Sequence, residues 1–390
     1  MSEIVIAGGG TGGHVFPGLA VAEELRRMGA AVSWVGAARG LEASVVPAAG
    51  IPLRLLNVTG IVARSRSAQV AAALRLMVAL ARAFVHLQRR QATAVLSVGG
   101  YASLPAAIAA AALGIPLVVQ EQNARPGLAN RLLAPWAVAI TCGFVEAARG
   151  FPSLPAIWTG NPIRPEFFAV PAPPRDELAV LVLGGSQGSA FLNRVLPPAF
   201  ARLAVSGHAP RILHQAGARS EVEVRARYAS VGVPAEVVGF LARPAEALAR
   251  VTLVVARAGA LTVSELAAAR RAALLVPFAA AAHGHQADNA YALAATGAAE
   301  VIAEERATPD RLALTLARLV SDRDQLITRG QAGAALARPD AACAVAQIVL
   351  QASGQTSPRP SAARNVGTQA HDRCLGGPGA VVPAPIGSGA

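Results

Sequence analysis

The chain has 390 residues, enough for two domains of ordinary size, and 53% of them are hydrophobic although only 4% are aromatic. All 35 basic residues are arginine, which excludes a Walker-type phosphate loop and Schiff-base chemistry, since both need lysine. The formal net charge of +12 favours anionic partners such as phosphates and acidic lipid surfaces. Nucleic acid is not expected as a partner, because aromatic residues are sparse and no nucleic-acid-binding motif is present.

Apolar runs that resemble strands alternate with helical patterns through the first half of the chain. We expect strands at residues 4–7, 32–35, 53–56, 95–98, 117–120 and 139–141. Strand-then-helix repetition of this kind predicts a parallel, doubly wound α/β sheet. The uncharged stretch 102–120 has the length of a membrane span, but Pro105, Gly114 and Pro116 divide it into a helix and a strand.

Glycines dominate the turn after the first expected strand, Gly8-Gly9-Gly10-Thr11-Gly12-Gly13-His14. A glycine turn that opens a helix exposes backbone N–H groups, which bind phosphate well. The turn contains a formal G-x-G-x-x-G, but no acidic residue ends the second strand to hold a ribose, so a nicotinamide or flavin enzyme is disfavoured. The alternative reading is a tight turn that only packs the helix on the sheet.

The second half repeats the same pattern after a proline-bearing connector at 159–174. Strands are expected at 179–183, 211–214, 236–238, 253–255, 273–276 and 299–302, and a second glycine turn, Gly184-Gly185-Ser186-Gln187-Gly188, follows the first of them. We therefore predict a domain at 1–160 and a domain at 161–352, whose last helix packs back towards the first domain. Residues 353–390 have the composition of a disordered tail.

Six segments in order resemble the MurG family of peptidoglycan glycosyltransferases, in glycosyltransferase family 28. They are Gly9-Gly10-Thr11-Gly12-Gly13-His14-Val15-Phe16-Pro17-Gly18, Gly99-Gly100-Tyr101, Glu121-Gln122-Asn123, Gly160-Asn161-Pro162-Ile163-Arg164, Gly184-Gly185-Ser186-Gln187-Gly188 and Arg257-Ala258-Gly259-Ala260-Leu261-Thr262-Val263-Ser264-Glu265. The resemblance implies a GT-B fold, with two doubly wound Rossmann-like domains facing an interdomain cleft. It implies inverting transfer of N-acetylglucosamine from UDP-N-acetylglucosamine to the C4 hydroxyl of undecaprenyl-diphospho-N-acetylmuramoyl-pentapeptide (lipid I), which forms lipid II. A UDP-sugar epimerase and a non-catalytic glycolipid-binding scaffold are the alternatives.

The resemblance also implies where each substrate binds. The acceptor diphosphate is expected at Gly10, Gly99, Gly100 and Tyr101, and further substrate contacts at Thr11, Gly12, Gly13 and, to the donor sugar, Asn123. The donor is expected at Ser186, at the helix start formed by Ala260, Leu261, Thr262, Val263 and Ser264, and at Glu265, which would accept the ribose hydroxyls. Leu241 is expected to contact the uracil through its backbone, and Gln286 to contact the sugar hydroxyls.

Three expected sites keep a plain structural alternative. Arg164 could steady the leaving diphosphate or form an interdomain salt bridge. Ser186 could contact phosphate or cap a helix. Glu265, placed in the first turn of its helix, could bind ribose or simply favour the helix dipole.

His14 is the candidate general base, because inverting transfer removes a proton from the acceptor hydroxyl. It could equally orient phosphate or cap the loop. No cofactor and no metal is expected, since Asp322-Arg323-Asp324 does not follow a central strand and His283-Gly284-His285 lacks a third ligand.

The segment 70–90 carries Leu74, Leu76, Met77, Leu80, Phe84 and Leu87, with Arg75, Arg82 and Arg89 on one face. With Gly60-Ile61-Val62-Ala63-Arg64-Ser65-Arg66 it could rest on an anionic membrane surface. We therefore expect a peripheral protein on the cytoplasmic face of the inner membrane. A core helix with a solvated arginine stripe is the alternative.

Overall fold

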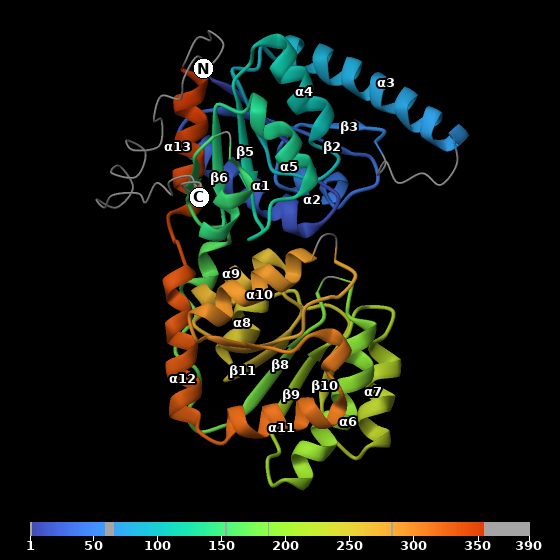
Figure 1. Ribbon diagram of the computed structural model, residues 1–390, viewed down its shortest axis with the longest axis vertical. Helices are drawn as coiled ribbons and strands as arrows, with labels where there is room; N and C mark the ends of the chain where they lie inside the picture. The colour runs from blue at the N-terminus through green and yellow to red at the C-terminus, as the bar shows by residue number, and fades with distance from the viewer. Residues whose placement is uncertain (1, 59–65, 153, 186, 282–283, 355–390) are drawn as a thin grey trace, which may run out of the picture. The chain divides into compact units, whose positions relative to one another are not determined.

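The computed structural model describes residues 2–58, 66–152, 154–185, 187–281 and 284–354, although not the side chains of 66–73. It divides into two compact units (Figure 1). The first comprises Met1–Ile163 and the segment that begins at Asp340, and the second comprises Arg164–Pro339. Most of the expected tail, and the expected contacts at Ser186 and 60–65, lie outside the described residues.

The first unit is built on a seven-stranded parallel sheet of order β3-β2-β1-β4-β5-β6-β7. Its strands are β1 (Glu3–Ala7), β2 (Ala31–Ala37), β3 (Leu53–Leu56), β4 (Ala94–Ser97), β5 (Leu117–Glu121), β6 (Ala139–Cys142) and β7 (Ala156–Trp158). Its helices are α1 (Gly12–Arg27), α2 (Glu42–Ala48), α3 (Arg66–Arg90), α4 (Leu104–Leu113), α5 (Leu128–Leu133), the short 3₁₀ segments η1 (Ala134–Trp136) and η2 (Val145–Gly150), and α13 (Ala341–Ser353). The six expected strands are confirmed, and β7 was not predicted.

The second unit is built on a six-stranded parallel sheet of order β10-β9-β8-β11-β12-β13. Its strands, all expected, are β8 (Ala179–Leu183), β9 (Arg211–Gln215), β10 (Glu236–Val238), β11 (Leu253–Ala256), β12 (Ala272–Leu275) and β13 (Ala299–Val301). Its helices are η3 (Pro165–Phe167), α6 (Ala190–Val205), α7 (Glu221–Ser230), α8 (Pro244–Ala249), α9 (Ala260–Ala268), α10 (His285–Ala295), η5 (Glu304–Arg306), α11 (Pro309–Val320), α12 (Arg323–Ala332) and η6 (Gly333–Leu336).

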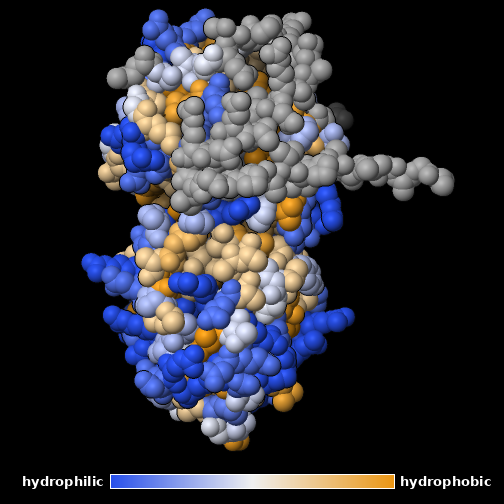
Figure 2. Space-filling model, turned by 90° about the vertical axis from the view of Figure 1, so that its left-hand side faces the viewer, coloured by the Kyte–Doolittle hydropathy of each residue, from blue (hydrophilic) through white to orange (hydrophobic). Residues whose placement is uncertain are grey.

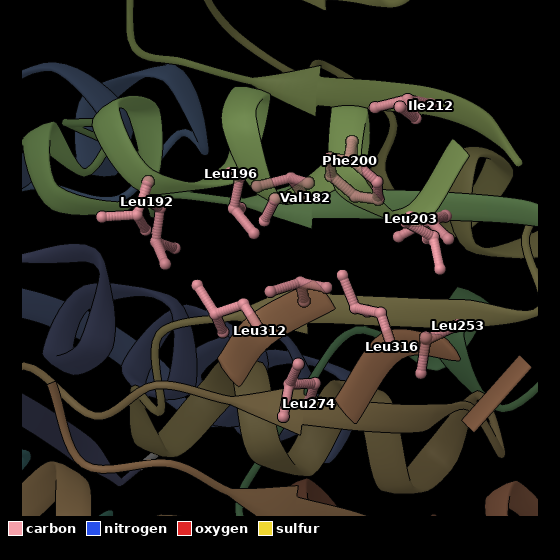
Figure 3. Packing of buried hydrophobic residues seen from close by; sticks show 14 of the residues in the cluster. Val182, Leu192, Leu196, Phe200, Leu203, Ile212, Leu253, Leu274, Leu312 and Leu316 are labelled. Carbon is pink, nitrogen blue, oxygen red and sulfur yellow. The ribbon is translucent and has the colours of Figure 1, made fainter. Parts of the chain in front are cut away.

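Both sheets are buried between helices, as parallel sheets must be. In the second unit, α6 directs one face into the core through residues spaced three or four apart, Leu192, Leu196, Phe200 and Leu203. Figure 3 shows them pointing towards Leu312 and Leu316 of α11. In the first unit α13 packs against α1 and the sheet, with Val345 and Val349 fully buried.

In each sheet the strand order reverses beside the first strand of the unit. The reversal lies between β1 and β4 in the first unit and between β8 and β11 in the second. Ligands of doubly wound folds bind outside the carboxyl ends of the strands at this switch point. The loops after these four strands are therefore the places to look for binding groups, and the glycine turns lie there.

Candidate substrate-binding sites

Two glycine loops pack on each other at the switch point of the first unit. Gly99 and Gly100 follow β4 with φ angles of 88° and 78°, in the left-handed region that favours glycine. A Cβ atom on Gly100 would lie 2.7 Å from the carbonyl oxygen of Gly9, and one on Gly99 would lie 3.1 Å from Nδ1 of His14. The structure thus brings together glycines predicted to bind the acceptor diphosphate and the histidine predicted to be the general base.

A buried carboxylate that sequence reasoning missed holds the first loop. Glu42 Oε2 accepts a hydrogen bond from the Gly10 N–H at 2.8 Å, and Oε1 accepts one from the Ala37 N–H at 2.7 Å. The Gly10 N–H is therefore already bonded inside the protein and is not free for the diphosphate contact that was expected there. The sequence signal that could have located Glu42 is the pair of glycines at positions 36 and 40. A side chain on either of them would collide with Glu42.

The start of α1 leaves backbone donors without a side-chain cap. Thr11 is the N-cap residue, with an extended conformation, and its hydroxyl makes no capping hydrogen bond. The first turn of α1 itself contains no acidic residue. The neighbouring Tyr101 is 47% exposed. This arrangement suits an anion such as a diphosphate.

His14 lies in the first turn of α1, and its Nδ1 is 3.2 Å from Oε1 of Gln122. Gln122 is buried in the loop after β5 and was not among the predicted site residues. The next residue, Asn123, is held by the buried carboxylate of Glu121, which accepts from the Asn123 N–H at 2.8 Å and from Nδ2 at 3.0 Å. Glu121 also accepts from Gly127 N and Asn130 Nδ2, so one carboxylate shapes the whole loop.

The second glycine turn lies at the switch point of the second unit. Gly188 has a φ of 76°, and a Cβ there would lie 2.1 Å from the carbonyl oxygen of Ala216. The helix that follows, α6, is capped by Ser189, whose hydroxyl accepts from the Leu192 N–H at 3.3 Å. Ser189 therefore fills the capping role that was the alternative for Ser186.

Side chains of α10 anchor the turn that begins α9. Gln286 Oε1 accepts from the Ala258 N–H at 3.2 Å and from the Phe278 N–H at 2.9 Å, while Asn289 Nδ2 donates to the Ala258 carbonyl at 3.2 Å. Because its oxygen is used inside the protein, Gln286 is left with its NH₂ group for the expected sugar hydroxyls. Gly259, the N-cap of α9, supplies no side chain, so the N–H groups of Ala260, Leu261 and Thr262 have no side-chain cap.

Arg257 connects three loops around this turn. It was not among the predicted site residues, although it lies in one of the segments that resemble the family. Its guanidinium donates to Ser189 Oγ at 3.0 Å, to the Val276 carbonyl at 3.0 Å and to Glu304 Oε2 at 2.8 Å. The rings of Phe191 and Phe278 lie 5.3 and 5.4 Å from it. This buried hub fixes the start of α6 relative to the start of α9.

Glu265 does not lie where the sequence placed it. The first turn of α9 contains no acidic residue, because the helix begins at Ala260 and Glu265 is its sixth residue. The dipole alternative for this residue is therefore wrong, since that effect fades within the first turn. Burial raises the pKa of Glu265 to about 7, against the charge of Arg164, which lowers it. A half-buried carboxylate with so high a pKa is typical of a ligand-binding group.

Arg164 is the first residue of the second unit and pairs there with Glu166 at 3.0 Å. It also lies over the ring of Phe167, 5.1 Å from its centre. Leu241 lies in the loop between β10 and α8, next to Phe240, which is 68% exposed.

The structure divides the apolar residues of α3 between two environments. Leu87 is buried, and Leu80 and Phe84 pack against the core, while Leu74 and Met77 are each 63% exposed. Arg75, Arg82 and Arg89 are all exposed. The described part of α3 is therefore a core helix at one end and an apolar surface at the other.

Among the residues that the structure describes, one helical stretch, Arg323–Ser353, is long and apolar enough by composition to cross a membrane, with a mean hydropathy of 1.2 over an 18-residue window. Buried core helices pass the same test, and here α12 packs on β12 of the second unit while α13 packs inside the first. Figure 2 shows the side of the molecule that carries α12, where hydrophilic residues lie next to a hydrophobic area. Asp322 caps α12, and Asp324 pairs with Arg175 at 2.8 Å.

Comparison with known proteins agrees with this arrangement. The "Glycosyltransferase family 28 N-terminal domain" matches residues 4–142, and the "Glycosyltransferase family 28 C-terminal domain" matches residues 179–345. A UDP-N-acetylglucosamine--N-acetylmuramyl-(pentapeptide) pyrophosphoryl-undecaprenol N-acetylglucosamine transferase of Cupriavidus metallidurans is 42% identical over 359 residues, which cover 90% of this chain and 99% of the relative.

Among solved structures, Acinetobacter baumannii MurG matches with a TM-score of 0.76 and 31% identity, over 90% of this chain and 100% of that one. A UDP-GlcNAc 2-epimerase from Neisseria meningitidis, bound to UDP-GlcNAc, is only 11% identical, with a TM-score of 0.64 over 90% of this chain and 99% of that one. This likeness concerns the fold alone. The match to both family domains and the 42% identical relative show that the chain belongs to glycosyltransferase family 28 and has its GT-B fold.

Proposed function

We propose that the chain transfers N-acetylglucosamine from UDP-N-acetylglucosamine to the C4 hydroxyl of lipid I, with inversion, and so forms lipid II. The observation that carries this proposal is the 42% identity to the Cupriavidus transferase over nearly the whole length of both chains. The uncapped backbone N–H groups at the starts of α1 and α9 support it, because the sugar donor and the acceptor substrate each carry a diphosphate. An epimerase needs no second diphosphate site.

The acceptor diphosphate is assigned to the first unit, at the loops of Gly99, Gly100 and Tyr101 and at the start of α1. His14 takes the proton from the attacking hydroxyl. The hydroxyl oxygen bonds to the anomeric carbon, the bond from that carbon to the diphosphate breaks, and UDP leaves with the electron pair. Support for this assignment comes from the uncapped helix start and from the position of His14, which follows the first glycine loop and lies beside Gly99 and Gly100 of the second.

The donor is assigned to the second unit. The uncapped N–H groups at the start of α9 would hold the diphosphate, and Arg164 would stabilise the charge that develops on it. Glu265 accepts the ribose hydroxyls, Gln286 donates to the sugar, and the backbone at Leu241 contacts the uracil. Asn123 as a donor-sugar contact and Ser186 as a phosphate contact stay predictions from the resemblance.

The decisive experiment uses labelled UDP-N-acetylglucosamine with a short-chain lipid I analogue. Labelled disaccharide and acceptor-dependent release of UDP would support the transfer. Altered sugar without acceptor would indicate an epimerase, and binding without turnover a scaffold; either result would overturn the proposal.

We also propose that the chain works as a peripheral protein on the cytoplasmic face of the inner membrane. The support is the exposed apolar end of α3, where Leu74, Met77 and Val78 lie among arginines. Flotation with vesicles that contain anionic lipid should recover the protein, and Leu74→Ser with Met77→Ser should reduce recovery severalfold. Leu314→Ser, at a residue that is 73% exposed on the second unit, is the matched control. Equal recovery of all variants would contradict the proposal.

A further inference from the structure

The amide of Gln122 can adopt only one orientation in this structure. One end of the amide faces two acceptors, the Val98 carbonyl at 2.8 Å and Oε1 of Gln120. The amide oxygen of Gln122 is itself an acceptor and cannot form a hydrogen bond with another acceptor, so this end must be the NH₂ group. Both glutamines are buried, and the backbone of Gln122 is held by Asn161, whose Nδ2 donates to its carbonyl at 2.9 Å.

This orientation directs Gln122 Oε1 towards His14 Nδ1, 3.2 Å away. A carbonyl oxygen only accepts, so Nδ1 must carry the proton. A neutral imidazole has a single N–H, which leaves Nε2 with its lone pair. Within the described ranges, no hydrogen-bond partner occupies Nε2.

We propose that Gln122 is a positioning residue, which holds His14 in the Nδ1–H tautomer so that Nε2 is the atom that accepts the proton of the acceptor hydroxyl. The catalytic role of Nε2 rests on the proposed function, whereas the tautomer itself does not. When the proton arrives at Nε2, both ring nitrogens carry hydrogen, and Gln122 Oε1 continues to accept from Nδ1. A glutamine orients the ring as a carboxylate would, but adds no negative charge beside the expected diphosphate.

The tautomer can be measured without any turnover. In the full-length chain labelled with ¹⁵N-histidine, the nitrogen shifts and couplings to the ring protons distinguish the Nδ1–H form from the Nε2–H form. A His14→Gln spectrum assigns the signal among the seven histidines. We expect His14 to be Nδ1–H at a pH where its ring is neutral. An Nε2–H form in the unaltered protein would overturn the proposal.

Gln122→Met removes the acceptor at nearly constant side-chain size. We expect the tautomer to shift towards Nε2–H and kcat to fall at least about tenfold, a part of what general base catalysis contributes, with the KM for UDP-N-acetylglucosamine unchanged. Gln347→Met is the matched control, because its amide donates to Cys343 Sγ instead. An unchanged tautomer in Gln122→Met would overturn the inference.

The two proposals fail in different ways. A protein with the Nδ1–H tautomer but no transfer activity would overturn the proposed function and leave the role of Gln122 intact. Transfer activity with the Nε2–H tautomer would overturn the role of Gln122 alone. The spectrum of the unaltered chain decides the tautomer even if a variant does not fold.

Discussion

Replacing Glu265 with glutamine should stabilise the free protein and weaken its binding of UDP. Burial raises the pKa of this carboxyl from 4.5 to about 7 in the folded chain. The unfolded chain releases the proton near 4.5 and the folded chain only near 7, so the stability supplied by the protonated group is lost as the pH rises between these values. At 1.36 kcal/mol per pKa unit, the ionised carboxylate costs about 3 kcal/mol above pH 7.

Glu265→Gln removes this cost, because glutamine carries no charge at any pH. We expect the free energy of unfolding at pH 8 to rise by up to about 3 kcal/mol relative to the unaltered protein, and to be nearly equal at pH 4.5. Denaturant titrations at the two pH values measure the difference. Glu246→Gln, which removes an exposed carboxylate paired with Arg243, should show no comparable dependence on pH.

The same substitution should raise the Kd for UDP about ten- to a hundredfold, because hydrogen bonds to a charged acceptor contribute about 1.5–3 kcal/mol. Calorimetric titration with UDP at pH 8 tests this. A variant that loses stability equally at both pH values would refute the reasoning from burial. Unchanged UDP affinity would refute the assignment of Glu265 to the ribose.

Three further predictions concern the loops. Gly100→Ala should unfold at a lower temperature and lose acceptor-dependent turnover, because its Cβ would collide with the Gly9 carbonyl oxygen. Gly29→Ala is the control, since Gly29 has a similar left-handed backbone but open space around it. Equal losses of thermal stability in both variants would refute the argument from this collision. Glu42→Gln should cost about 1–3 kcal/mol of stability by unpairing a backbone N–H, and it should raise the acceptor KM. The partly exposed Glu24→Gln, whose carboxylate pairs with Arg27, should change neither. Arg257→Met should cost about 3–5 kcal/mol by removing the cation that pairs with the Glu304 carboxylate, and it should weaken UDP binding by calorimetry. Unaltered stability would contradict the role of Arg257 in connecting the three loops.

Local signals in the sequence were sufficient for the strands and the glycine turns. Short runs rich in apolar residues, separated by helical patterns, were enough to predict twelve of the thirteen strands, including β10 and β13 with only three residues each. The exception, β7, has three residues after Pro155 and pairs with β6 alone at the edge of the sheet.

Only the tertiary structure decided how the polar groups are used. Glu42 is 32 residues from the glycine that it holds, and Gln122 is 108 residues from His14, so no sequence window contains either pair. The pKa of Glu265 depends on burial and on Arg164, about 100 positions away in the chain. Backbone conformation is encoded locally by residue type, whereas hydrogen-bond partners and desolvation depend on which strands become neighbours. The sequence therefore located the loops, and folding determined the proton positions and charges within them.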